Sequence, residues 1–204
     1  MIGYTHNNSI TAVRSFYHFL ATLPRLSTED IVNPLNEGWP DLTDAYIAPL
    51  GKNAAVCDLL RHLPYIRSNG QGNDQVVLMT RATNYYDSAT RWTFDRGLVD
   101  GNLAPYGAGT VPPHLAVLTS GSRSEPARDN PDAWRAYHTR PVADFFEEWK
   151  EKYRTLDWAA VVESVDDGIM FRHDVSTDEV RQIYRDNGWP DAFNREGCEE
   201  TVPA

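Results

Sequence analysis

The sequence has few cysteines, and they form no motif that holds a metal ion or a disulfide scaffold. Cys57 and Cys198 lie far apart in the chain, outside any Cys-X-X-Cys or Cys/His pattern. A zinc module or a disulfide framework would need such a pattern. A chain of 204 residues can bury a substantial core without either. We therefore expect two free thiols, no metal site and no bound cofactor.

Long hydrophobic runs and a targeting signal are also absent from the sequence. No stretch approaches the roughly 18 consecutive apolar residues that read as a membrane-spanning helix. The opening MIGYTHNNSI has neither the basic nor the apolar region of a secretory signal. We expect a cytoplasmic protein.

Positive charge is scarce in this chain. The 19 Lys and Arg residues stand against 29 Asp and Glu residues, which gives a formal net charge of −10, and no cluster of basic residues interrupts it. A field of this sign repels phosphate backbones and anionic lipids. We expect no nucleic-acid partner and no membrane partner, which leaves a protein partner or a small apolar ligand.

Common catalytic signatures are missing as well. The chain contains no P-loop and no G-X-G-X-X-G, G-X-S-X-G or H-E-X-X-H motif. These motifs would indicate nucleotide binding, dinucleotide binding, an α/β-hydrolase or a zinc protease, respectively. The sequence therefore names no reaction, and whether the protein is an enzyme stays open.

The chain is rich in aromatic residues. Hydrophobic residues make up 41% and aromatic residues 11% of the chain, which is typical of a globular protein. We expect an α+β fold in one domain spanning residues 1–204, with N-terminal helices, a small mostly antiparallel sheet and C-terminal helices. The expected parts are about 9–66 for the helices, about 67–121 for strands and long loops, and about 130–195 for C-terminal helices and a hairpin.

Apolar residues at helical spacing predict four helices in the first third of the chain. The last of these lies in AVCDLLRHLPYI at residues 55–66, with Asn53 as its N-cap and Pro64 at its end. We expect it to bury its leucines at the junction between the helical part and the sheet, with residues 65–66 extended. The other three helices are predicted at residues 10–23, with Ser9 as N-cap, and at 28–38 and 44–50.

Short apolar runs between polar turns predict the strands. They are expected at residues 75–80, 90–94 and 114–119, and as a hairpin of 159–165 with 169–173. Residues 97–113 show no hydrophobic period, so we expect a long loop that could form the rim of a pocket.

Three helices are predicted in the C-terminal part, at residues 131–137, 142–153 and 177–187. The middle one carries an aromatic stripe, which could be a ligand platform but is more typical of a buried core. The tetrapeptide Gly-Trp-Pro-Asp occurs at 38–41 and again at 188–191. In both places we expect it to end a short acidic helix, with glycine in a left-handed conformation and tryptophan packing back. The flanks do not match, so this is repeated local chemistry rather than a domain duplication.

Several segments resemble a group of largely uncharacterised proteins common in filamentous fungi. They are RSFYHFLATLP, GWPDLT, LGKNAAVCDLLRHLPYI, VPPHLAVLT, WRAYHTRPVADFFEEWKEKYRTLDW and IYRDNGWPDAF, and together they cover most of the chain. The order of helices, strands and a Trp/Phe-rich helix also resembles the Smi1/Knr4 (SUKH) type of α+β domain, whose members are mainly interaction or immunity modules. The chain departs from the fungal group after Gly121, where SRSEPARDN replaces a strand with an LLLDT-like sequence. A missing strand would expose a sheet edge, leave it to another segment, or open a groove.

Asp58 and His62 are the catalytic candidates. They stand four residues apart on the predicted helix, where a carboxylate can orient an imidazole as a general base. The alternative is a helix whose polar side forms ordinary salt bridges, with His62 favoured near the helix C-terminus. The acidic residues around His173 could offer metal ligands, but a strand end and a capping box explain them. The binding candidates are Arg61, Tyr85, Tyr86, Trp92, Tyr106 and His114.

Two functions from different classes follow from this pattern. The favoured one is a noncatalytic intracellular protein-interaction module that recognises a partner through its loop-rich face. The alternative is a small enzyme or ligand-binding protein of fungal specialised metabolism, with an aromatic-lined pocket.

Overall fold

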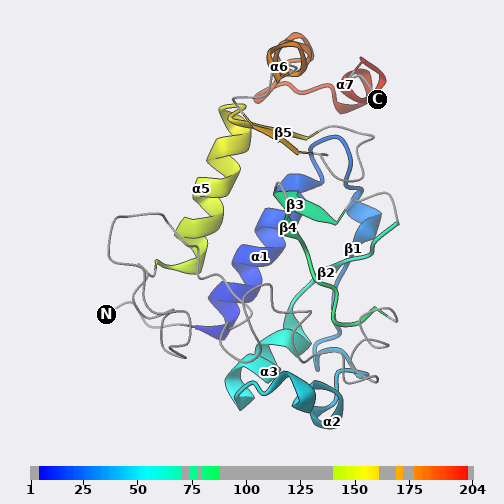
Figure 1. Ribbon diagram of the computed structural model, residues 1–204, viewed down its shortest axis with the longest axis vertical. Helices are drawn as coiled ribbons and strands as arrows, with labels where there is room; N and C mark the ends of the chain where they lie inside the picture. The colour runs from blue at the N-terminus through cyan, green and yellow to red at the C-terminus, as the bar shows by residue number, and fades with distance from the viewer. Residues whose placement is uncertain are drawn as a thin grey trace, which may run out of the picture.

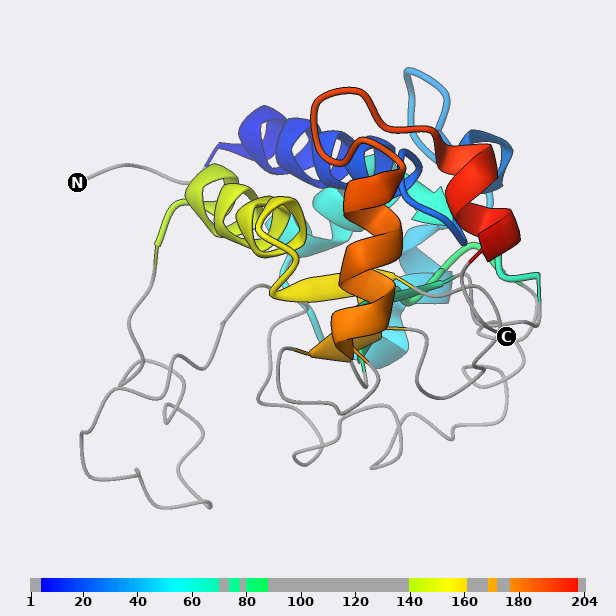
Figure 2. The ribbon, with the colours of Figure 1, turned by 90° about the horizontal axis from the view of Figure 1, so that it is seen from above.

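Two long helices, α1 (His6–Leu20) and α5 (Val142–Arg154), lie side by side on one side of the molecule (Figures 1 and 2). The structure is a computed structural model, and it describes residues 5–69, 74–77, 80–87, 140–160, 169–171 and 177–201. Within these ranges six α-helices and three two-stranded antiparallel sheets form an α+β domain, as the sequence predicts. No helix in the same ranges is long and apolar enough to cross a membrane.

Some predicted elements fall outside these ranges. They are the strands at 90–94 and 114–119, the loop at 97–113, the helix at 131–137 and the segment after Gly121.

Aromatic rings join α1 to α5. Phe16 of α1 stacks on Phe146 of α5 with ring centroids 4.8 Å apart, and it meets Trp149 edge-on at 5.5 Å. About one turn after Phe16 in α1 and after Trp149 in α5, Phe19 lies 6.0 Å from Tyr153, so the two helices run in the same direction. The aromatic stripe of α5 is therefore core, as predicted.

Helix α1 begins one turn earlier than predicted. Its N-cap is Thr5, and Ser9 lies buried inside the first turn, where its hydroxyl donates to the Thr5 carbonyl at 3.3 Å. Serine is favoured at an N-cap, but inside a helix its hydroxyl can also bond back to the carbonyl four residues earlier, so a serine alone does not fix the helix start. The expected start at residue 9 was wrong for that reason.

The helix predicted at residues 28–38 does not form. A 3-10 turn, η1 (Thr28–Asp30), opens with the capping box of Ser27, and the chain then enters β1 (Ile31–Val32). β1 pairs antiparallel with β2 (Tyr65–Ile66), which follows α3. The β-branched pair in β1 gains more from this pairing and burial than from another helical turn.

The next helices agree with the prediction. α2 (Asp44–Ile47) continues into η2 (Ala48–Leu50), and α3 (Ala54–His62) follows. The Asn53 side chain accepts from the Val56 amide at 3.0 Å as the N-cap of α3. α3 ends before Pro64, after which the chain is extended as β2.

Two more hairpins complete the strands. The single strand expected at 75–80 is instead β3 (Gln75–Val77) paired with β4 (Thr80–Arg81). The expected C-terminal hairpin is confirmed as β5 (Trp158–Ala160) paired with β6 (Ile169–Phe171).

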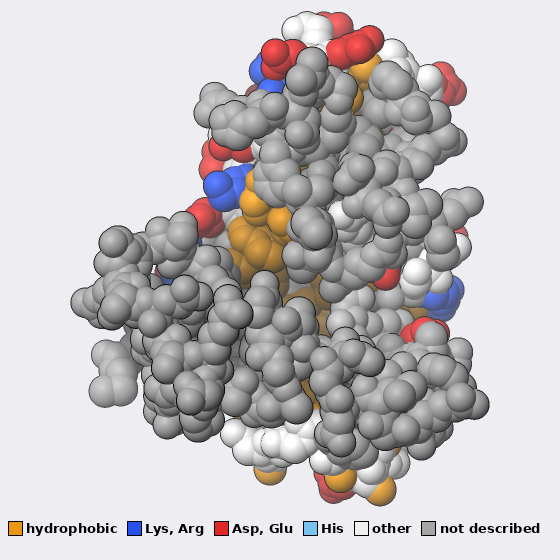
Figure 3. Space-filling view, viewed as in Figure 1, with side chains coloured by type: hydrophobic (Ala, Val, Ile, Leu, Met, Phe, Trp, Pro, Cys, Tyr) orange, Lys and Arg blue, Asp and Glu red, His pale blue; other side chains and the backbone are white. Residues whose placement is uncertain are grey.

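The C-terminal helices lie at one end of the molecule (Figure 1). α6 (Thr177–Asp186) was predicted, and its Tyr184 donates to the Ala160 carbonyl of β5 at 2.7 Å. α7 (Arg195–Thr201) was not predicted. Its sequence REGCEET has one apolar residue, the buried Cys198, and one apolar residue cannot show a helical hydrophobic period. Asp and Glu side chains gather over this end in Figure 3, whereas hydrophobic side chains show beside α5.

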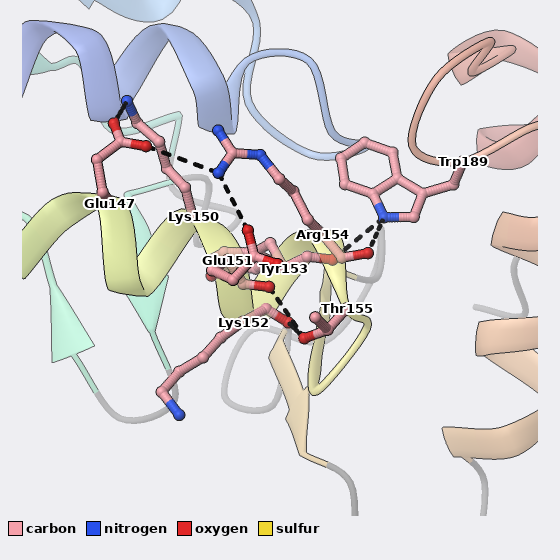
Figure 4. A network of polar contacts seen from close by, with 8 residues as sticks. All are labelled: Glu147, Lys150, Glu151, Lys152, Tyr153, Arg154, Thr155 and Trp189. Atoms are coloured by element: carbon pink, nitrogen blue, oxygen red, sulfur yellow. Dashed lines mark hydrogen bonds and ion pairs between the residues drawn. The ribbon is translucent and has the colours of Figure 1, made fainter.

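The repeated Gly-Trp-Pro-Asp segment has the same role in both places. Gly38 and Gly188 have φ angles of 89° and 82°, so the left-handed glycine is confirmed. The Trp39 indole donates to the Leu63 carbonyl at the end of α3, at 2.9 Å. The Trp189 indole donates to the last carbonyls of α5, those of Tyr153 at 3.2 Å and Arg154 at 3.1 Å (Figure 4).

Each tryptophan therefore closes the C-terminal end of a different helix. The prediction that both copies follow a helix was wrong for the first copy, because a strand and a turn precede Gly38.

Candidate functional site

A pocket of about 430 Å³ opens beside Trp39. Its size falls within the range of small-molecule sites, which is about 300–1,000 Å³. Another cavity, beside Leu23 and Tyr153, has room for about 10 Å³, which is at most a water molecule. We call the larger one the Trp39 pocket. The residues that line it in the described ranges are Val32, Asn33, Trp39, Arg67, Asn84, Tyr86 and Asp87.

One wall of the Trp39 pocket is aromatic. Trp39 stacks on Tyr86 with ring centroids 4.4 Å apart and an angle of 28° between the ring planes. Trp39 also stacks on Tyr65 of β2, with ring centroids 5.8 Å apart. Trp39 is thus nearly buried in contact with two tyrosines, while Tyr86 is half-buried at the pocket.

Backbone hydrogen bonds fix this aromatic wall. The Trp39 amide donates to the Arg61 carbonyl at 2.9 Å, and its indole donates to the Leu63 carbonyl. Asn84 holds the opposite side, because its amide nitrogen donates to the Ile66 carbonyl at 3.1 Å. Its side-chain oxygen accepts from the Tyr86 amide at 3.0 Å. The pocket is therefore built on β2 and the end of α3.

Polar and charged side chains form the rim. Arg67 and Asp87 are exposed, and Arg67 directly follows β2. Asn33 accepts a hydrogen bond from Arg14 of α1 at 3.3 Å. Leu35 lies on the turn between Asn33 and Trp39, and 65% of its surface is exposed. The site combines an aromatic wall, a polar rim and an exposed apolar side chain.

The predicted binding residues divide into three groups. Tyr86 lines the pocket, whereas Tyr85 packs against Tyr65 at 6.1 Å, and burial raises its pKa. Arg61 points elsewhere: its Nε donates to the Leu42 carbonyl at 2.7 Å, and its guanidinium pairs with Asp44. Arg61 therefore ties α3 to the start of α2. The candidates Trp92, Tyr106 and His114 lie outside the described residues.

The catalytic candidates lie in a second place, together with a residue that the sequence did not suggest. His6, at the start of α1, places its Nε2 at 3.1 Å from one carboxylate oxygen of Asp58. Nδ1 of His62 lies 3.5 Å from the other oxygen and 2.8 Å from the Asp58 main-chain carbonyl. The two imidazole rings meet edge-on with centroids 5.1 Å apart. We call these three residues the imidazole cluster.

This geometry does not favour His62 as a general base. Its Nδ1 contacts the Asp58 carbonyl rather than being held by the carboxylate, as an oriented base would be. Its Nε2, which would take the substrate proton, lies against the Gly38 turn, where a Cβ would come within 3.3 Å. The pair Asp58 and His62 is close, but it faces the backbone.

The two thiols differ in environment. Cys198 is fully buried, and burial raises its pKa to about 11. Cys57 is half-buried, and its thiol lies 3.7 Å from the Lys52 carbonyl. A buried thiol with a raised pKa is a poor nucleophile, so Cys198 is a packing residue.

Sequence reasoning missed most of the pocket. Trp39 was noted only as part of the repeated tetrapeptide, and Arg67, Asn84 and Asp87 stand in no motif. These residues come together because β1 pairs with β2. A helix at residues 28–38, as predicted from the sequence, leaves no strand there to form that pair. His6 carries no local signal, because its partners are on α3.

Comparisons with protein-family models, with curated proteins and with solved structures find no match for this chain.

Proposed function

We propose that this protein is a noncatalytic binding module that recognises a protein partner through the Trp39 pocket. The observation that carries the proposal is an exposed leucine beside an aromatic pocket. Leu35 is 65% exposed, and it lies on the turn that joins the lining residues Asn33 and Trp39. A single exposed leucine is ordinary, but this one lies on the short turn between two residues that line the pocket, so a partner bound there would pass close to it.

The pocket and the turn suit different parts of a partner chain. A side chain of the partner would enter the pocket and pack against Tyr86, since buried anchor residues carry most of the free energy of protein recognition. Asn33, Arg67 and Asp87 would bond to polar groups around that anchor, as the rim of an interface does. Leu35 would lie along the partner's backbone.

Two features of the whole chain support the same proposal. The net charge of −10 favours a partner with positive charge, because complementary charge speeds association. The resemblance to the Smi1/Knr4 (SUKH) type of domain is also consistent with an interaction module. That resemblance, the resemblance to fungal proteins and an intracellular location remain predictions.

The test is a selection of displayed random peptides on the purified full-length protein. We expect selected peptides to share one large apolar anchor residue. Calorimetry should show at least about tenfold weaker binding to Tyr86→Ala, and weaker binding to Leu35→Ser, because both remove interface contacts. Phe193→Ala, which removes a half-buried ring near α7, is the matched control and should bind as the wild type does. Selected peptides that bind Tyr86→Ala as tightly as the wild type would contradict the proposal.

A second candidate function is a small-ligand site, and the volume of the Trp39 pocket favours it. About 430 Å³ admits a ring system that could lie against Tyr86. A fragment library screened by NMR on the same variants distinguishes the two functions. Fragments that need Tyr86 but not Leu35, with no peptide selected, would favour the small-ligand site.

A further inference from the structure

We propose that the imidazole cluster is a binding site for a divalent transition-metal ion, with Zn²⁺ as the ion that fits best. One ligand atom from each of His6, Asp58 and His62 lies within 4.8 Å of the other two. Two imidazoles and one carboxylate are ligands that Zn²⁺ takes readily. The site lies apart from the residues that line the Trp39 pocket, and the proposal does not depend on the function of that pocket.

The ligand atoms lie near the spacing of tetrahedral coordination. With zinc bonds of about 2.0 Å, two ligand atoms of a tetrahedron lie about 3.3 Å apart. The distance from His6 Nε2 to one carboxylate oxygen of Asp58 is 3.1 Å, and the distance from His62 Nδ1 to the other oxygen is 3.5 Å. Each imidazole is therefore at about the required distance from the carboxylate, although on different oxygens. Since the three ligand atoms lie within 4.8 Å of one another, the side chains must draw closer together for one ion to bind all three.

His6 gives a second, independent observation. Its Nε2 is buried from solvent, and within the described part of the chain no group forms a hydrogen bond with it. The nearby Asp58 oxygen is close enough but lies in the wrong direction for a hydrogen bond. A buried ring nitrogen without a partner is unfavourable, and a metal ion between His6 and Asp58 would satisfy it.

His62 can supply its Nδ1 to the ion. Because a carbonyl oxygen only accepts, the 2.8 Å contact with the Asp58 carbonyl means that Nδ1 carries a proton without metal. Metal binding replaces that proton, which goes to the solvent, and the ion takes the lone pair. Nε2 faces Gly38, so Nδ1 is the nitrogen nearer the carboxylate, 3.5 Å from one of its oxygens, and binding the ion requires Nδ1 to turn from the Asp58 main-chain carbonyl toward it.

The cluster leaves one coordination position for water. The side chains of His6, Asp58 and His62 are 30%, 54% and 25% exposed, so the carboxylate side opens to solvent. A bound ion would join the first turn of α1 to α3, two elements far apart in sequence. Because the unfolded chain lacks this arrangement, the ion should stabilise the folded protein.

The test is a Zn²⁺ titration of the full-length protein against a chromophoric chelator, together with thermal unfolding with and without Zn²⁺. The variants are His6→Ala and His62→Ala. His18→Ala is the matched control, because it removes an exposed imidazole from the same helix as His6. Circular dichroism checks that each variant is folded. His62 packs beside Gly38, so His62→Ala can disturb folding, whereas His6 stands at the end of a helix. If His62→Ala does not fold, the result for His6→Ala decides the test.

We expect one Zn²⁺ per wild-type chain and a loss of affinity of at least about tenfold in His6→Ala and His62→Ala. Zn²⁺ should raise the Tm of the wild type and of His18→Ala, but not that of His6→Ala. Equal affinity in the wild type and His6→Ala would overturn the proposal. So would an equal loss in His18→Ala, which would indicate nonspecific binding to histidines.

Discussion

Trp39 stacks on Tyr86 at 4.4 Å, and the two rings have unequal burial. Trp39 is 9% exposed and anchors a small core with Leu42 and Tyr65, while Tyr86 is half-buried at the edge of the pocket. The pair thus links a structural residue to a residue that is available for binding. This difference should separate effects on stability from effects on recognition.

The first prediction concerns this pair. Trp39→Ala should lower the free energy of unfolding by about 3–5 kcal/mol, because it removes a buried ring and the indole donor to the Leu63 carbonyl. Tyr86→Ala should lower it by only about 1 kcal/mol, because the ring is half-buried. Urea denaturation measures both values. Equal losses of unfolding free energy in the two variants would contradict the assignment of Trp39 to stability and Tyr86 to binding.

The second prediction concerns the contact between α1 and α5. Phe16→Ala should cost about 3–5 kcal/mol, because Phe16 is fully buried and stacks on Phe146. Leu35→Ala, an apolar truncation at a 65% exposed position, is the control and should stay within about 0.5 kcal/mol of the wild type. Denaturant midpoints of the two variants give the comparison. A small effect of Phe16→Ala would mean that the two helices are not the core.

The third prediction concerns pH. Lys150 is 5% exposed, and its ammonium donates to Glu147 at 2.6 Å and to Ser15 of α1 at 2.7 Å (Figure 4 shows the first contact). The hydrogen bond from Lys150 lowers the pKa of Glu147 below its ordinary 4.5. The resulting stability is present above the ordinary pKa and is lost as pH falls through the lowered value. Because Glu147 is more than half exposed, the gain is below about 1 kcal/mol.

Glu147→Gln should therefore be less stable than the wild type at pH 7. The difference between the two proteins should shrink as pH falls below about 4.5. Glu37→Gln, which removes a carboxylate from the exposed turn before Gly38, is the control. Unfolding followed at a series of pH values measures the difference. A difference in stability between the wild type and Glu147→Gln that grows as pH falls would contradict the predicted direction of the pH dependence.

The fourth prediction concerns two glycines with positive φ. A Cβ at Gly188 would lie 2.4 Å from the Ala192 carbonyl oxygen, whereas a Cβ at Gly51 would meet nothing within 4 Å. Gly51→Ala should cost about 1 kcal/mol from backbone strain alone. Gly188→Ala adds a clash with the backbone and should cost about 3 kcal/mol. If thermal unfolding shows equal losses, the turn after α6 is looser than its geometry indicates.

Local chemistry made much of the fold predictable. The Asn53 cap, the stop at Pro64 and the aromatic stripe of α5 depend on neighbouring residues only, and the structure has all three. β1 was mistaken for a helix because its partner, β2, is distant in sequence. Pairing of that kind is invisible to a local pattern.

The candidate sites depend even more on distant contacts. Asp58 and His62 could be paired from their spacing, but His6 joins them only because α1 packs near α3. Tyr86 was proposed for the pocket, whereas Trp39 reaches it through the turn after β1. A tryptophan in a helix-stop motif gave no reason to expect a binding wall.

The most direct test of the proposed binding site is the pair of indole signals from Trp39 and Trp189. Both indoles donate to a carbonyl at the end of a helix, but Trp39 lines the pocket, and Trp189 packs with Tyr184 and Phe193. In ¹⁵N-labelled protein, with signals assigned by Trp39→Phe and Trp189→Phe, a selected peptide should shift the Trp39 signal and leave the Trp189 signal in place. A peptide that shifts Trp189 while Trp39 stays unchanged would contradict the account.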